Sequence, residues 1–82
     1  MIINFSTKFI KITFEKDEPF SGKSIRMKGE ALSNGFDASL VSAEWLENHI
    51  GSSISSNDLH LIKEIIEENN KTSSFQVLFM GE

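Results

Sequence analysis

The stretch from Ile54 to Asn69 constrains the fold most, because it carries the clearest helical period in the chain. At 100° per residue its apolar side chains fall on one arc roughly 160° wide, and its charged side chains fill the rest of the circumference. That arc consists of Leu59, Leu61, Ile62, Ile65 and Ile66. A helix of this kind must bury its apolar face, and in a short chain the available partner is a sheet formed by the other segments.

The start of this helix has strong local signals. Ser55 is the expected N-cap, and Asp58 follows three positions later in an arrangement close to a capping box. Ile54, before the cap, faces Leu59 in the first turn, as in a hydrophobic staple. These residues predict that the helix begins directly after Ser55.

Four segments alternate apolar and polar side chains with the period of two that is typical of half-buried strands. Three precede the helix, at residues 8–15, 24–30 and 36–41, and the fourth follows it at residues 75–80. Asn34-Gly35, between the second and third segments, is a strong hairpin signal. The expected fold is α+β: an antiparallel meander of three strands plus a C-terminal strand, with one amphipathic helix packed on one face.

The same patterns predict the core. One side of each strand and the apolar face of the helix are expected to meet in a single hydrophobic layer. Its expected members are Ile10, Ile12, Phe14, Ile25, Met27, Phe36, Ala38, Leu40, Phe75, Val77 and Phe79 from the strands, and Leu59, Ile62, Ile65 and Ile66 from the helix.

Two segments leave alternatives open. Residues 1–5 form either a further strand or an irregular lead-in. Residues 42–53 form either a short helix, capped by Ser42 and ended by Gly51, or an irregular loop held by Trp45. We favour a short helical turn for the second segment.

Length and composition predict one domain over residues 1–82, with no disulfide framework because the chain has no cysteine. The two histidines, His49 and His60, have no metal-binding spacing around them. No serine lies in a nucleophile-elbow pattern, and no histidine neighbours a candidate nucleophile. We therefore expect a protein that is not an enzyme and has no catalytic residues, cofactor or metal.

Charge and hydropathy limit the location and the partners. No apolar run approaches the roughly 18 residues of a membrane span, and the N-terminal residues lack the pattern of a signal peptide. We therefore expect a cytoplasmic protein without a membrane partner. Residues 1–28 carry six basic and three acidic side chains, whereas residues 29–82 carry two basic and nine acidic ones. The acidic second part argues against nucleic acid and favours a basic protein surface as partner.

Acidic side chains gather in two places near features that could contact a protein. They are Glu64, Glu67 and Glu68 on the outer edge of the predicted helix, and Glu44 and Glu47 on either side of Trp45. The tryptophan is expected either to cover the end of the sheet or to anchor a protein contact. On the sheet face away from the helix, Phe9, Leu78 and Met80 are either covered by neighbouring segments or form a contact patch.

The order of motifs carries a family resemblance. The chain has Phe9-Ile10-Lys11-Ile12 in a strand, Gly29-Glu30 at the end of the next, Phe36-Asp37-Ala38-Ser39-Leu40, then Trp45 and a Glu-rich helix before a final strand. From Lys8 to Phe79 this order resembles a small bacterial immunity-protein family of polymorphic or contact-dependent toxin systems. The resemblance implies a protein encoded beside a toxin, whose activity it neutralises by direct binding.

The expected function is therefore that of an antitoxin-like immunity protein, which occludes a cognate toxin domain without a cofactor. Complementary charge would accelerate association with a basic toxin, so the expected contacts are Glu44, Trp45, Glu47, Glu64, Glu67 and Glu68. The alternative is a small structural or dimerising accessory module that associates through Phe9, Leu78 and Met80. We expect a monomer or a weak homodimer.

Overall fold

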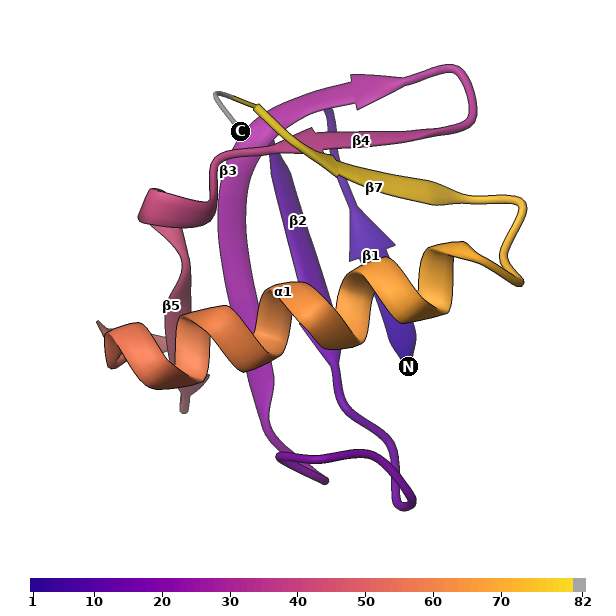
Figure 1. Cartoon of the computed structure of the whole chain (residues 1–82). Helices are drawn as coiled ribbons and strands as arrows, with labels where there is room; N and C mark the ends of the chain where they lie inside the picture. The colour runs from indigo at the N-terminus through magenta and orange to yellow at the C-terminus, as the bar shows by residue number, and fades with distance from the viewer. Residues whose placement is uncertain (81–82) are drawn as a thin grey trace.

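The computed structural model describes residues 1–80 and consists of a strongly curled sheet crossed on its concave side by the long helix α1 (Figure 1). The elements are β1 (Ile2–Phe5), β2 (Phe9–Thr13), β3 (Ser24–Leu32), β4 (Gly35–Ala38), the 3₁₀ turn η1 (Leu40–Ser42), β5 (Glu44–Glu47), β6 (Ile50–Ser53), α1 (Ser56–Asn70) and β7 (Gln76–Phe79). Among residues 1–80, no helix has the length and apolar character needed to cross a membrane. The α+β class predicted from the sequence is confirmed.

Strand β3 organises the sheet because it pairs on both of its edges. One edge of β3 pairs with β2. The other edge pairs with β5 along the first part of β3 and with β4 along its last part, so the sheet continues from this edge as two separate branches. The main order is β1-β2-β3-β4-β7, with β6 attached to β5. All neighbouring strands are antiparallel except β4 and β7, which are parallel. The sheet has seven strands, whereas the sequence predicted four.

The short helix predicted within residues 42–53 is wrong, because this segment forms the hairpin β5–β6. Trp45 pairs with Ile25 of β3, which places it on the inner side of the sheet, where its ring packs against the core. The two hairpin turn residues, Asn48 and His49, have φ angles of 52° and 67°. Positive φ at both positions is typical of a type I′ turn, whose backbone twist matches that of the two strands it connects.

The two ends of the chain also form strands. Residues 2–5 pair with β2 as strand β1, which resolves the alternative left open for the N-terminus. The last strand is shorter than predicted, and it lies beside β4 at the edge of the sheet. Helix α1 begins as predicted: the Ser55 side chain accepts a hydrogen bond from the Asp58 N–H at 3.2 Å. The helix ends at Asn70.

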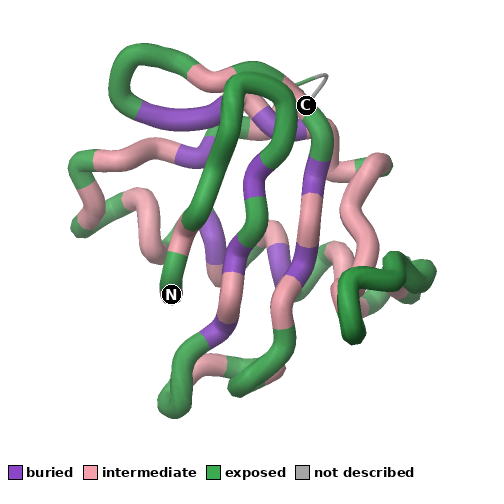
Figure 2. Tube along the Cα trace, turned by 180° about the vertical axis from the view of Figure 1, so that it is seen from behind, coloured by how far each residue is buried: buried purple, intermediate pink, exposed green. Residues whose placement is uncertain are grey.

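The core lies between α1 and the concave face of the sheet, and buried residues alternate with exposed ones along β2 and with partly buried ones along the first half of β3 (Figure 2). Within the described part of the chain, ten hydrophobic residues are buried, and all ten belong to the predicted layer: Ile10, Ile12, Phe14, Ile25, Met27, Phe36, Ala38, Ile62, Ile66 and Val77. Four other predicted members are partly buried against them: Leu40, Ile65, Phe75 and Phe79. Leu61, on the same helical arc, remains 39% exposed.

Candidate functional site

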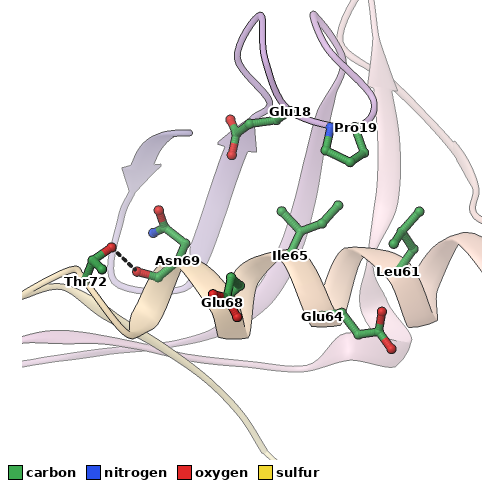
Figure 3. Close-up of a pocket in the computed structure, with 8 residues that line it drawn as sticks. All are labelled: Glu18, Pro19, Leu61, Glu64, Ile65, Glu68, Asn69 and Thr72. Atoms are coloured by element: carbon green, nitrogen blue, oxygen red, sulfur yellow. Dashed lines mark hydrogen bonds between the residues drawn. The ribbon is translucent and has the colours of Figure 1, made fainter.

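The surface between α1 and the loop that connects β2 to β3 is hollowed into an open groove of about 570 Å³. Its lining residues are Glu18 and Pro19 from the loop, and Leu61, Glu64, Ile65, Glu68, Asn69 and Thr72 from the helix and the turn after it. Leu61 and Ile65 point from the helix toward the loop, where Pro19 faces them (Figure 3). These three residues form an apolar floor, and the three glutamates form its acidic rim.

The loop that forms one wall of the groove is anchored at its base. Phe14 is buried, and its carbonyl accepts a hydrogen bond from the Gly22 N–H at 2.8 Å, which closes the loop. The Phe20 ring lies 5.9 Å from that of Phe14, between centroids. Phe20 and Gly22 adopt φ angles of 61° and 81°, so the backbone turns tightly here. The tip of the loop is thereby held facing α1.

The N-terminal ammonium group of Met1 binds the same loop. Its nitrogen lies 2.8 Å from Glu15 Oε2 and 3.0 Å from Glu18 Oε1. The hydrogen bond to Glu15 is the main reason why the pKa of this amine lies above its ordinary value of 8.0; burial opposes the rise, and Glu18 adds to it. The Glu18 carboxylate also accepts a hydrogen bond from the Glu15 N–H at 2.7 Å. Glu18 is therefore held in place, and its charge is partly balanced.

This ammonium group predicts a pH-dependent contribution to stability. Because its pKa is higher in the folded state, the contribution is complete below pH 8.0 and is lost as the pH rises through the folded-state pKa. The pair is accessible to solvent, so we expect less than about 1 kcal/mol. Unfolding by denaturant at neutral and at alkaline pH measures the loss, which should shrink in the Glu15→Gln/Glu18→Gln variant. An unchanged loss in that variant would contradict the assignment.

On the helix side of the groove, the structure separates the three predicted acidic residues. Glu64 and Glu68 line the groove, whereas Glu67 is exposed outside it. Glu68 forms an ion pair with Lys71 at 3.0 Å, but both side chains are at least 70% exposed. Such an exposed ion pair contributes little to stability, so Glu68 can readily leave it and bind a new partner. The helix therefore supplies two carboxylates that a bound cation can reach.

The second predicted acidic set lies on β5, apart from the groove. Glu44 forms an ion pair with Arg26, its registered neighbour on β3. The Trp45 ring contacts Phe20 edge to face, with centroids 5.1 Å apart, and the Lys23 ammonium lies 5.0 Å from its centroid. Glu47 is exposed at the end of the strand. The tryptophan thus connects the hairpin to the β2–β3 loop.

The apolar residues of the alternative interface do not form a continuous patch. Phe9, Leu78 and Met80 are each more than 40% exposed. Phe9 is registered with Lys28 on β3, whereas Leu78 is registered with Asp37 on β4, which pairs with Glu30. Charged side chains therefore lie between the two ends of the predicted patch.

The groove presents apolar and acidic side chains to solvent. Within residues 1–80, no three His, Cys, Asp or Glu side chains are placed to hold a metal ion together. An apolar floor with carboxylates around it can accept the aliphatic part of a lysine or arginine side chain and bind its charged end. No protein-family model, curated protein or solved structure matches this chain.

Sequence reasoning missed the loop side of the site, Glu18 and Pro19. The segment between β2 and β3 contains an acidic cluster followed by Pro19-Phe20. Phe20 was the available signal, because proline is common in turns for conformational reasons, whereas phenylalanine is not among the residues that turns favour. The spacing did not indicate which element this segment packs on.

Proposed function

We propose that this protein is an immunity protein that binds and occludes a basic surface of a cognate toxin domain through the groove beside α1. The observation that carries the proposal is the combination of an apolar floor with an acidic rim on an open surface. Lysine and arginine side chains suit this combination because their stems are apolar and their ends are charged. Occlusion of this kind requires no cofactor.

Charge favours the same kind of partner. The chain has a formal net charge of −4, and its second part carries most of the acidic residues. Opposite charges on two proteins steer their encounter and raise the association rate, by an amount that falls as salt is added. The hydrophobic floor adds a contribution that salt does not screen. The proposal therefore predicts a salt-dependent association rate with a residual affinity at high salt.

The first test asks whether the protein neutralises a toxin at all. The C-terminal domain encoded by the neighbouring gene is expressed in bacteria with and without this protein. We expect growth arrest in its absence and growth in its presence. Growth arrest that is unaffected by co-expression would overturn the proposed function.

The second test locates the contact. Replacing Glu64 and Glu68 with lysine reverses the rim charge, and we expect the association rate to fall by about tenfold or more at low salt. Asp17→Lys/Glu30→Lys is the matched control, because it makes the same change in net charge at exposed positions outside the groove. Stopped-flow association at several salt concentrations measures both variants. Equal slowing by the two pairs would indicate net charge rather than the groove.

A further inference from the structure

Among residues 1–80, three strands lie at free edges of the sheet, and the edge at β7 is blocked. At β7, the Asn70 side chain occupies the edge: its amide donates to the Val77 carbonyl at 2.9 Å and accepts from the Val77 N–H at 3.0 Å. At β1, the Phe75 ring packs on the Phe5 ring with centroids 4.8 Å apart, which is a contact on a face of the strand and not on its backbone edge. Natural sheets block their edges, as Asn70 does at β7, because unpaired backbone groups bind other strands.

Strand β6 has an open edge without a side-chain block of this kind. All four of its residues are exposed, and it contains neither a charged residue nor proline, which are the usual obstacles to strand addition. In a two-residue hairpin the residues next to the turn form a hydrogen-bonded pair, so Ile50 and Ser52 bond toward β5. The N–H and C=O groups of Gly51 and Ser53 therefore point away from the sheet.

We infer that β6 is a binding site for an extended, basic segment of another protein, which adds to the sheet as a further strand. The backbone groups of Gly51 and Ser53 would hydrogen-bond to the segment, as in other cases of strand addition. This site is separate from the groove beside α1, and the inference does not depend on the proposed toxin partner.

The side chains around β6 determine the chemistry of the segment. A Cβ atom at Gly51 would meet the Glu44 carboxylate, so that carboxylate lies over the strand on one face. On the other face, exposed Glu47 is registered with Ile50, which is itself 70% exposed. Each face thus offers a carboxylate beside the edge, although Glu44 shares its charge with Arg26 and Lys23 lines the same hollow as Glu47. An added strand with lysine or arginine near Glu47 and an apolar residue beside Ile50 fits this environment.

A second copy of the chain fits the edge less well. Two β6 strands paired with each other would be only four residues long, and they would bury far less than the roughly 1,200 Å² of a stable interface. Self-pairing would also bring together two hairpins that each carry Glu44 and Glu47, in chains of net charge −4. Like charges across such a pair are unfavourable.

A defined peptide tests the inference on the isolated protein. The probe is a short acetylated peptide of alternating lysine and valine, compared with the same length of alternating glutamate and valine. We expect amide chemical-shift changes concentrated at residues 50–53 with the lysine peptide, together with slower hydrogen exchange at Gly51 and Ser53. A lysine peptide methylated on every backbone nitrogen keeps its charge but loses its donors, so it should bind at least tenfold more weakly.

Substitutions at Ser53 give the matched comparison. Ser53→Pro removes the outward N–H and should weaken the lysine peptide at least tenfold, whereas Ser53→Ala keeps it and should stay within twofold. If Ser53→Pro fails to fold, the methylated peptide still decides the question. Equal binding of the methylated and unmethylated peptides, or shift changes centred on Glu64 and Glu68, would overturn the inference. Dimerisation of the protein through β6 in sedimentation would also overturn it.

Discussion

Replacing Gly35 with alanine is expected to destabilise the protein by about 3 kcal/mol and to loosen β7 from the sheet. Gly35 lies directly beside Gln76 in the parallel pairing of β4 with β7. A Cβ atom at this position would overlap with the Gln76 carbonyl group, and the backbone N of Gln76 would be 3.2 Å away. These are backbone atoms on a paired strand, so relief requires β7 to move as a whole.

Thermal unfolding of the Gly35→Ala variant measures this effect, and a loss of 3 kcal/mol corresponds to roughly 12–24 °C in a domain of this size. Gly51→Ala is the matched control, because its new methyl group would meet only the end of the Glu44 side chain, which can turn away if it gives up its partly exposed ion pair with Arg26. We expect the control to lose less than about 1 kcal/mol. A Gly35→Ala variant as stable as the control would show that β7 does not approach β4 so closely.

The core was predictable from the sequence because burial follows local periods. Along β2 the buried residues are Ile10 and Ile12, two positions apart, and along α1 they are Ile62 and Ile66, four positions apart. These spacings are the strand and helix periods, and each can be recognised within a few residues. The helix cap at Ser55 was predictable for the same reason, since its partner is only three positions away.

The hairpin β5–β6 was not predictable in the same way, because half of it has no buried side. All four residues of β6 are exposed, so no alternation between core and solvent marks the strand. Its turn contains Asn48-His49 rather than the glycine-containing pairs that signal such hairpins most strongly. What positions β5 is its pairing with β3, a contact between residues about twenty positions apart.

Gly35 has a different structural role from the turn position that the sequence predicted for it. The Asn34-Gly35 dipeptide predicted a hairpin, and a hairpin is present. However, Leu32 pairs with Gly35, so the turn residues are Ser33 and Asn34, and the glycine belongs to the strand. The glycine permits the close approach of β7, whose position depends on long-range pairing that no local pattern encodes.

The candidate site was predictable only on its helix side. Glu64 and Glu68 were singled out because they lie on the polar edge of an amphipathic helix, and both line the groove. Glu18 and Pro19 come from a loop more than forty positions earlier, and their place depends on how the loop closes on Phe14. Glu44 is held by Arg26 across two strands, which the sequence alone did not indicate.

Replacing Asn70 with alanine is the other change with a large expected effect. The Asn70 side chain, at the end of α1, makes two hydrogen bonds to Val77 and so acts as a neighbouring strand for β7. Its backbone carbonyl also accepts a hydrogen bond from the Gln76 side chain at 2.7 Å. Alanine would leave the N–H and C=O of Val77 without these partners in a partly buried site. We expect a loss of about 2–3 kcal/mol in the free energy of unfolding.

Asn69 provides the matched control for this experiment. Asn69→Ala removes the same side chain one position earlier, at the groove, where the Asn69 backbone carbonyl accepts hydrogen bonds from Thr72 that the substitution leaves in place. We expect the control to remain within about 0.5 kcal/mol of the wild type in chemical denaturation. Asn70→Asp separates the two bonds at Val77, because a carboxylate can still accept from the Val77 N–H but cannot donate to its carbonyl.

Hydrogen exchange at Val77 then tests the role of Asn70 as an edge block, beyond its effect on stability. If the side chain protects the edge, exchange of this amide should accelerate in Asn70→Ala more than exchange of the β4 amides does, and the variant should self-associate at high concentration. Equal stability of the Asn69→Ala and Asn70→Ala variants would contradict this role. In that case β7 would be held by its pairing with β4 alone, and the contrast between a blocked β7 and an open β6 would be lost.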